Sequence, residues 1–363
     1  MATAFSSIPI LNFSLSQRAA TKPQFLAALR TALTDVGFFY LAEHTVPAAT
    51  VDALAAYAPR FFALPAAEKE RIRMVHSPHF FGYSAYGAEL TKGRVDQREQ
   101  FDFGTSTAPR ALAPGDPAYL RLWGPSQWPA DALLPGFRAV CTAYAAHLQA
   151  LSAALLALVA EALLLPRDAF RQFFEEGGNE DRLKIVKYPP PAPGASDQGV
   201  GPHFDGGFLT LLLQASPHRG LQVQNRAGTW IDAPPVPGTF VVNIGKALET
   251  VTQGVAIATS HRVLSPEPGS TPRYSVPFFQ MVSQDTVIGR QVLDMPAEML
   301  KIKEARGQVI ADSINYAEYN ELPSGLVALI GRIKSHPDVA ERHYPELFSR
   351  FFPNGLPEKG MAY

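Results

Sequence analysis

The chain has 363 residues, of which 47% are hydrophobic and 18% are charged, and its formal net charge is -1. This composition is typical of a globular protein, and so small a net charge excludes the strongly basic surface that binds nucleic acid or an anionic membrane. The single cysteine, Cys141, excludes an intrachain disulfide and any cysteine-rich metal site. We therefore expect a cytoplasmic protein with a small-molecule partner and with no nucleic acid, membrane or obligate protein partner.

The N-terminal third has the pattern of alternating helices and strands. Residues 1–17 lack the basic start and the long apolar run of a signal or transit peptide, so we expect a first strand there. Apolar residues at helical spacing predict helices over 25–36 and 51–61, which end at Gly37 and Pro65. A compact apolar strand is predicted directly after the first of these helices.

A proline- and glycine-rich stretch over 104–136 predicts a long irregular connection, followed by a helix over 137–165. Part of this helix, residues 148–166, is apolar enough to resemble a membrane span. Because Gln149 and Glu161 interrupt it, the sequence favours a long buried helix.

From Arg182 onward the pattern changes to short apolar runs separated by turn residues. These runs are "RLKIVKYPP", "FLTLLLQ", "GLQVQN", "TWIDAPP", "GTFVVNIG", "SHRVL" and "RYSVPFFQMV". Strands at this regular spacing, with no helices between them, are typical of an antiparallel sandwich or barrel of the jelly-roll kind. After about residue 290 the pattern becomes helical again.

One stretch, "GVGPHFDGGFLTLLLQ" at 199–214, combines metal-binding residue types with an expected strand. Residues two apart in a strand share a face, so His203 and Asp205 can point to one place. His261, in "TSHRVL", can complete a set of two imidazoles and one carboxylate. Such a set leaves open metal positions and suits Fe(II) that binds a cosubstrate and oxygen. An HxD pair alone is weak evidence, because the chain has nine histidines.

A second polar pair strengthens the hypothesis. In "RYSVPFF", Arg273 and Ser275 alternate onto one face of an expected strand. A guanidinium beside a hydroxyl is suited to a carboxylate, which it binds through paired hydrogen bonds. The alternative is a solvated charge on an edge strand, but an arginine that leads an apolar strand favours burial with an anion.

These motifs resemble the iron- and 2-oxoglutarate-dependent oxygenases of the isopenicillin N synthase-like family. Further motifs that carry the resemblance are "KYPPPAP", "GLQVQNRAGTWIDAPPVPGTFVVNIG", "GFFYLAEH" and "FFALPAAEK". The resemblance implies a fold that is mainly β with flanking helices: a double-stranded β-helix (jelly-roll) core, an N-terminal α/β extension and a C-terminal helix. We expect an N-terminal region over 1–120, a connection and bracing helix over 121–177, the core over 178–285 and a helical segment over 286–363, in one compact unit.

The same resemblance implies the cofactors and their ligands. Iron(II), 2-oxoglutarate and oxygen are the implied reactants, with ascorbate as a reductant. The implied catalytic iron ligands are His203, Asp205 and His261. The implied residues for the distal carboxylate of 2-oxoglutarate are Arg273, Ser275 and Tyr188. Val186 stands where the family usually has an asparagine.

Candidate substrate-binding residues are less sharply defined. Phe279 shares the strand face of the arginine–serine pair, although a plain core phenylalanine is the alternative. Tyr83, Tyr86 and Phe101 lie in a region that lines the entrance in the family. Lys184 can anchor an anionic or carbonyl group of the substrate, or it can be solvated. Four further histidines have no carboxylate at matching spacing and are expected at the surface: His76, His79, His336 and His343.

The sequence therefore predicts an oxygenase that oxidises a small metabolite, by hydroxylation, desaturation or ring formation, and decarboxylates 2-oxoglutarate to succinate. Secondary metabolism or an amino-acid-like substrate is expected. One alternative is an iron oxidase of the same fold that needs no 2-oxoglutarate and binds its substrate's carboxylate with the arginine–serine pair. A zinc hydrolase would also suit two histidines and an aspartate. A binding module that has lost catalysis fits the intact triad less well.

Overall fold

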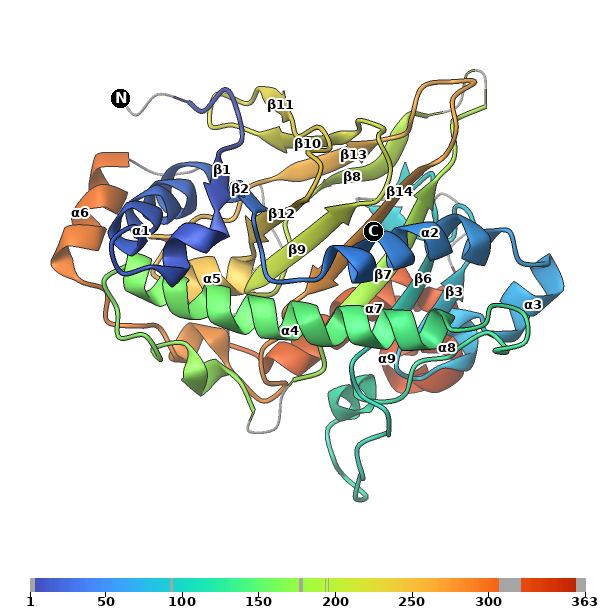
Figure 1. Cartoon of the computed structure of the whole chain (residues 1–363). Helices are drawn as coiled ribbons and strands as arrows, with labels where there is room; N and C mark the ends of the chain where they lie inside the picture. Colours follow the sequence, from blue (N-terminus) through green and yellow to red (C-terminus); the bar gives the residue numbers. More distant parts are fainter. Residues whose placement is uncertain are drawn as a thin grey trace.

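A computed structural model of the chain describes residues 4–91, 94–175, 179–192, 194, 196–306 and 321–356. Within these residues, two facing β-sheets form the centre of the molecule (Figure 1). The large sheet has the order β1 (Ile10–Asn12), β2 (Phe38–Ala42), β12 (Thr239–Ile244), β9 (Leu209–Gln214), β14 (Arg273–Phe279), β7 (Arg182–Tyr188), β6 (Glu99–Gly104) and β3 (Gly82–Ser84). The small sheet has the order β11 (Trp230–Asp232), β10 (Leu221–Gln224), β13 (His261–Leu264) and β8 (Gln198–His203). A separate pair, β4 (Leu90–Thr91) and β5 (Arg94–Val95), lies outside both sheets.

This arrangement confirms the predicted jelly-roll core with its N-terminal extension. The predicted strands over 182–282 all form, and they pair antiparallel with one another. The N-terminal strands join the same large sheet, because β2 pairs with β12 and β6 pairs with β7. The extension is therefore a continuation of the core sheet.

The outer face of the large sheet is covered by the long helix α4 (Phe137–Ala162), which runs across the strands in Figure 1. Strand alternation places Leu183 and Ile185 of β7 on this covered face, where they are fully buried in the main hydrophobic core. By length and composition α4 could cross a membrane, with a mean hydropathy of 1.6, yet 56% of its apolar window is buried inside the molecule. The prediction of a core helix agrees with this packing.

Helices α1 (Lys22–Thr31) and α2 (Ala48–Phe62) pack against α4. After α1 one wider turn, Ala32–Val36, leads to Gly37, whose φ of 73° ends the helix in the left-handed conformation, as predicted. The proline-rich connection holds one short 3-10 helix, η4 (Ala118–Leu122). Helix α3 (Ala66–Arg71) follows α2, and α5 (Lys246–Val251) follows β12.

The C-terminal segment contains several helices where a single one was predicted. They are α6 (Ala297–Arg306), α7 (Ser324–Ser335), α8 (Pro337–His343) and α9 (Pro345–Phe351). Proline at the first position of α8 and of α9 starts a new helix and ends the preceding one. Helix α7 packs on η4 and α8 packs on the 3-10 turn before β3, with Phe80, Leu329 and Tyr344 in a separate small core. Helix α6 packs instead on the wider turn Ala32–Val36.

Candidate active site

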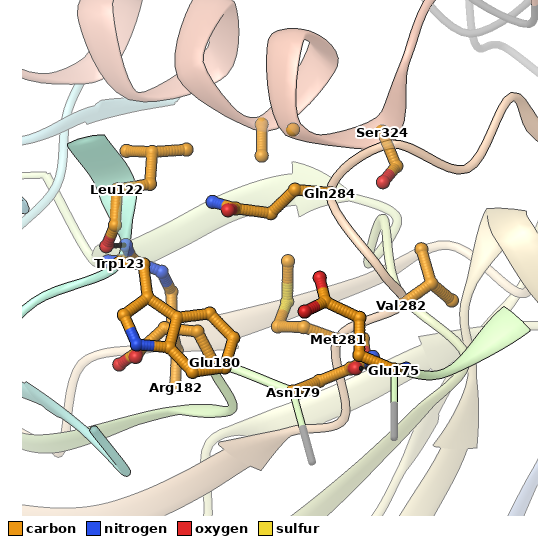
Figure 2. A pocket seen from close by; sticks show the side chains of 12 residues that line it. Leu122, Trp123, Glu175, Asn179, Glu180, Arg182, Met281, Val282, Gln284 and Ser324 are labelled. Carbon is orange, nitrogen blue, oxygen red and sulfur yellow. Dashed lines mark hydrogen bonds between the residues drawn. The ribbon is translucent and has the colours of Figure 1, made fainter. Parts of the chain in front are cut away.

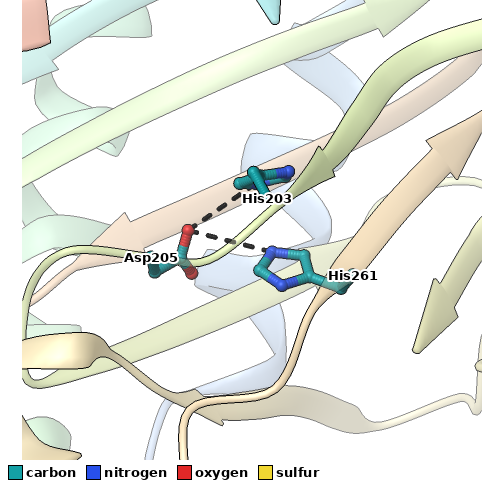
Figure 3. Close-up of side chains that lie close together, drawn as sticks. All are labelled: His203, Asp205 and His261. Carbon is teal, nitrogen blue, oxygen red and sulfur yellow. Dashed lines mark ion pairs between the residues drawn. The ribbon is translucent and has the colours of Figure 1, made fainter. Parts of the chain in front are cut away.

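His203, Asp205 and His261 converge at the edge of the small sheet (Figure 3). His203 is the last residue of β8 and His261 is the first residue of β13, and the two are direct partners in the strand register. Asp205 Oδ1 lies 3.7 Å from His203 Nε2 and 3.8 Å from His261 Nε2. The three candidate ligand atoms all lie within 4.8 Å of one another. Such a cluster can bind a single metal ion.

The prediction that His203 and Asp205 share a strand was wrong in one respect. Strand β8 ends at His203, and Asp205 lies in the turn that leads to β9. The turn, and not strand alternation, brings the carboxylate to the imidazoles. Gly207 in this turn permits a close approach of the backbone, because a Cβ there would lie 2.6 Å from the carbonyl oxygen of Gln280.

Hydrogen bonds fix the orientation of each of the three side chains. His203 Nδ1 lies 2.8 Å from the carbonyl oxygen of Gly201, and His261 Nδ1 lies 3.2 Å from that of Thr259. With the protons on Nδ1 donated to these carbonyls, both Nε2 atoms keep their lone pairs for a metal. Hydrogen bonds also hold the carboxylate of Asp205.

Two polar side chains of the large sheet hold Asp205. Thr210 Oγ1 donates to Oδ2 at 2.6 Å, and Asn243 Nδ2 donates to the same oxygen at 2.7 Å. These bonds leave Oδ1 directed at the imidazoles. Sequence reasoning missed both residues, although Asn243 is the only polar residue in the apolar run "FVVNI", which was a usable signal.

The electrostatics of the cluster suit a divalent cation. Burial lowers the pKa of His203, and burial together with the neighbouring His203 lowers the pKa of His261 to about 4, so both rings are neutral near pH 7. Burial opposes ionisation of Asp205, but the two imidazoles and the hydrogen bonds from Asn243 and Thr210 hold its pKa below its ordinary value. Two neutral imidazoles and one carboxylate are the forms in which these groups bind metal.

Arg273 lies on the large sheet, on the opposite side of the interior from the triad. Its side chain is completely buried, its Nη2 donates to Gln214 Oε1 at 3.2 Å, and its Nε and Nη1 have no partner among the described residues. The guanidinium carbon lies 5.0 Å from the centre of the Tyr188 ring. A Cβ on Gly220, where φ is 149°, would lie 3.3 Å from Arg273 Cδ, so a glycine makes room for the arginine. A buried guanidinium with two unpaired nitrogen donors fits a carboxylate.

The triad and Arg273 line one cavity of about 560 Å³. This volume lies within the range of roughly 300–1,000 Å³ that is usual for small-molecule sites. Ser275, Tyr188, Val186 and Phe279 also line the cavity. The predicted cosubstrate residues are therefore brought together with the predicted metal ligands in one space.

Three of the predicted substrate residues do not line this cavity. Phe101 is completely buried on the other face of β6, where it packs against Phe137 of α4. Tyr83 is buried as well and donates to Glu99 Oε2 at 2.8 Å. Tyr86 is 49% exposed and bonds with Gln97. Strand alternation explains the position of Phe101: its neighbours in β6 face the interior between the sheets, so Phe101 itself faces the helices.

The surface expectation was also wrong for His336, which is 2% exposed and lies 3.7 Å from a Glu89 oxygen. His79 and His343 are half-buried, and each contacts a backbone carbonyl, so His76 is the exposed one of the four. Lys184 is buried at the cavity wall beside the same Glu89, so it is not a solvated lysine.

A second, much smaller cavity of about 20 Å³ lies between η4 and α7 (Figure 2). Trp123, Arg182, Met281 and Gln284 are among its lining residues. Arg182 Nη2 donates to the carbonyl oxygens of His79 and Leu122, at 3.0 and 2.9 Å. The volume has room for about one water molecule, so this cavity is not a substrate site.

Two neutral histidines and one carboxylate that face a buried arginine inside a jelly roll are typical of the class of non-haem iron oxygenases. The comparison with protein families gives the same class and narrows it. Residues 180–282 match the family described as 2OG-Fe(II) oxygenase superfamily, and residues 8–131 match the family described as non-haem dioxygenase in morphine synthesis N-terminal. The chain belongs to the 2OG-Fe(II) oxygenase superfamily, and it is a dioxygenase that uses Fe(II), 2-oxoglutarate and oxygen.

Individual proteins show the same relationship over almost the whole chain. The chain is 43% identical to the 2-oxoglutarate-dependent dioxygenase frbJ of Dothideomycetidae sp. (strain 11243), over 95% of each protein. It is 33% identical to homoarginine-6-hydroxylase 2-ODD-C23 of Glycine max, over 79% of this chain and 89% of that protein. A full-length Neurospora crassa protein, solved in complex with alpha-KG and 5-formyluracil, superimposes with a TM-score of 0.64 at 26% identity, over 79% of this chain and 89% of that one. The comparisons confirm the predicted enzyme class and give no support to a zinc hydrolase or to a 2-oxoglutarate-independent oxidase.

Proposed function

We propose that this dioxygenase hydroxylates a small metabolite in the 560 Å³ cavity, and we assign the roles of the residues that line it. The proposed iron ligands are His203, Asp205 and His261. The proposed ligands of the distal carboxylate of 2-oxoglutarate are Arg273, Ser275 and Tyr188. One observation supports the assignment above all: the triad and Arg273 line the same cavity from the two different sheets. Arg273 is fully buried, and its Nε and Nη1 have no hydrogen-bond partner among the described residues.

When iron, 2-oxoglutarate and oxygen are bound, they supply the oxidising power, with release of succinate and carbon dioxide and transfer of one oxygen atom to the substrate. The side chains of the protein position these reactants. Arg273 and Ser275 hold 2-oxoglutarate at one end, while Thr210 and Asn243 keep the Asp205 carboxylate directed at the metal position. Val186 presents an apolar side chain at the cavity wall between these groups.

The names of the relatives support a small polar substrate. One relative is named for the hydroxylation of homoarginine, and one solved structure is described in complex with 5-formyluracil. We infer a small metabolite of comparable size, of an amino-acid-like or secondary-metabolite class. The net charge of -1 and the single cysteine support a cytoplasmic protein that binds neither nucleic acid nor a membrane and needs no obligate protein partner.

The test is turnover by the purified protein with Fe(II), 2-oxoglutarate and oxygen in the presence of candidate metabolites. We expect one succinate per product formed, and no product when 2-oxoglutarate is omitted. An Asp205→Ala variant should lose most of this activity while its far-ultraviolet circular dichroism stays unchanged. Sustained product formation without 2-oxoglutarate, or full activity of the Asp205 variant, would overturn the assignment.

A further inference from the structure

Four charged side chains gather on the part of the cavity wall that β6, β7 and α7 form. Arg98 directly precedes β6, Lys184 lies in β7, Arg332 lies in α7, and Glu89 directly precedes β4. All four line the cavity, and the iron and 2-oxoglutarate sites described above use none of them. We call this set the charged wall.

The cations of the charged wall pair with Glu89, which lines the cavity, and with Asp96 and Asp102, which do not. Glu89 Oε2 lies 2.7 Å from Arg98 Nη2, and Glu89 Oε1 lies 3.4 Å from Lys184 Nζ. Asp102 Oδ1 lies 3.2 Å from Arg332 Nη1 and 3.6 Å from Lys184 Nζ. Asp102, however, is 1% exposed and does not line the cavity. A ligand at the charged wall therefore meets the three cations of the wall and one carboxylate, that of Glu89.

Arg98 and Glu89 of the charged wall differ in how completely their polar atoms are paired. Arg98 is nine-tenths buried, and its Nε has no hydrogen-bond partner among the described residues. The carboxylate that pairs with it from behind, Asp96 at 3.1 Å, is fully buried. Glu89, by contrast, already lies near Arg98, Lys184 and His336. Because Lys184 and Arg332 line the cavity while Asp102, the carboxylate that pairs with both, does not, the wall favours an anionic ligand over a cationic one.

The charged wall lies beside the metal-binding triad. Gly201, two residues before His203, donates its backbone N–H to Asp96 Oδ1 at 3.3 Å, and Asp96 Oδ2 lies 3.1 Å from Arg98 Nη2. The wall and the triad line the same cavity, and these contacts tie Arg98 to the strand that carries His203. Apolar side chains such as Phe279 and Val186 line other parts of the cavity.

We propose that the substrate is a small carboxylic acid, and that the charged wall binds its carboxylate through Arg98, Lys184 and Arg332. The carbon skeleton then lies along the apolar lining, with the oxidised carbon at the triad. The two guanidinium groups can each make paired hydrogen bonds to a carboxylate. This inference rests on the proposed function, because it takes the triad as the place of oxidation. The substrate carboxylate is separate from the one that Arg273 holds.

The test uses the full chain loaded with Mn(II) and saturating 2-oxoglutarate under anaerobic conditions, so that the Arg273 site is filled and no turnover occurs. The probes are matched pairs of a carboxylic acid and its primary amide: hexanoate and hexanamide, phenylacetate and phenylacetamide, and L-homoarginine and its carboxamide. Dissociation constants come from calorimetric titration. At least one acid should bind about ten- to hundredfold more tightly than its amide. If no acid binds more tightly than its amide, the proposal is wrong.

Variants of the wall separate its role from general effects of charge. Arg332→Gln should weaken binding of the acid about tenfold or more and leave the amide unchanged. Arg98→Gln alone would remove an ion-pair partner of Glu89 and leave its carboxylate less well paired. The second test is therefore the double variant E89Q/R98Q, which removes both charges. Arg71→Gln, whose parent side chain is 75% exposed on α3, is the matched control and should bind like the parent. Acid binding that persists in both Arg332→Gln and E89Q/R98Q would overturn the proposal.

The same samples distinguish this inference from the proposed function. Binding of 2-oxoglutarate to the Mn(II)-loaded parent protein, compared with its binding to Arg273→Gln, reports on the iron and cosubstrate sites. If 2-oxoglutarate does not bind, the proposed function fails. If 2-oxoglutarate binds normally and acids show no preference over amides, only the carboxylate inference fails.

Discussion

Arg273 is a fully buried charge and Asp205 a partly buried one, and neither has a complete set of partners among the described residues. Arg273 is fully buried with Nε and Nη1 unpaired, and Asp205 directs Oδ1 at two neutral imidazoles. Burial of a charge is costly unless that charge is paired, so both positions suit a ligand of opposite charge, as the proposed function requires. At the scale of residues, the site is therefore ready to bind one cation and one carboxylate before either arrives.

The carboxylate site can be tested with Arg273→Gln. This change removes a charge-assisted pair of hydrogen bonds worth about 1.5–3 kcal/mol, which corresponds to roughly ten- to hundredfold weaker binding of 2-oxoglutarate. Titration of 2-oxoglutarate in the metal-loaded protein measures the effect. The metal content of the variant should equal that of the parent. Ser275→Ala should weaken 2-oxoglutarate binding less than Arg273→Gln does. Unchanged 2-oxoglutarate affinity in Arg273→Gln would contradict the assignment.

The hydrogen bonds behind the metal site give a second prediction. Asn243→Ala or Thr210→Val frees Oδ2 of Asp205 from one of its two donors, so the carboxylate can rotate away from the imidazoles. Loss of such an orienting contact usually costs about ten- to hundredfold in metal affinity. Competition with a coloured chelator for Fe(II) measures it. Thr142→Val, at an exposed threonine of α4, is the control, and equal metal affinity in all three variants would refute the role.

At the scale of elements, α7 closes one side of the cavity and packs its other face into the small C-terminal core. Leu329 and Ile333 are fully buried in that core, whereas Ala328, Gly331 and Arg332 line the cavity. Gly331 is unusual within this helix, because a Cβ there would have no atom within 4 Å. The glycine therefore leaves open space at the wall next to Arg332.

Substitutions at Gly331 should separate helix stability from cavity size. Gly331→Ala should raise the free energy of unfolding by up to about 1 kcal/mol, because alanine is the better helix former. Gly331→Leu should fold as well but narrow the cavity, so we expect a higher KM for the larger substrates of a series and little change for the smallest. Denaturant unfolding and a substrate series measure the two effects. An equal rise in KM for substrates of all sizes would show that the leucine side chain of Gly331→Leu does not enter the cavity.

At the scale of the whole molecule, Asp181 joins three separate parts of the fold. It directly precedes β7, and it accepts hydrogen bonds from Gln149 of α4 at 3.0 Å and from the backbone N–H of Met281, just after β14, at 2.9 Å. Burial raises its pKa from 3.8 to about 7. The helix that covers the large sheet is therefore tied to the core through a carboxyl group that favours its protonated form.

This shift predicts how the stability depends on pH. Because the folded state binds the Asp181 proton more tightly than the unfolded state does, its contribution is fully present below about pH 4 and is lost as the pH rises through about 7. Asp181→Asn should remove this part of the pH dependence. The difference in melting temperature, parent minus variant, should thus decrease as the pH is raised from 5 to 8. Asp168→Asn, at an exposed loop position, is the control. A constant difference across this range would contradict the prediction.

The sequence by itself indicated the fold class, the arginine–serine pair and the three candidate metal ligands, and its resemblance to a known family gave the enzyme class. These features depend on residue type and short spacing: alternation in a strand, the length of apolar runs, and the chemistry of imidazole, carboxylate and guanidinium groups. Glycine as the stop of the first helix was predictable for the same reason, because Gly37 adopts a conformation that other residues avoid. Such signals are local in the sequence, so they can be recognised without any knowledge of the tertiary packing.

The tertiary structure alone decided which distant residues meet and which face each one presents. Phe101 and Tyr83 were expected in the cavity, but the register of β6 against β7 turns Phe101 to the helices, and Tyr83 is buried against Glu99. Glu89 meets Lys184 and His336 only because β7 and the C-terminal helices pack around it. Contacts across such separations follow from the burial of apolar faces over the whole molecule, and no local pattern in the chain encodes them.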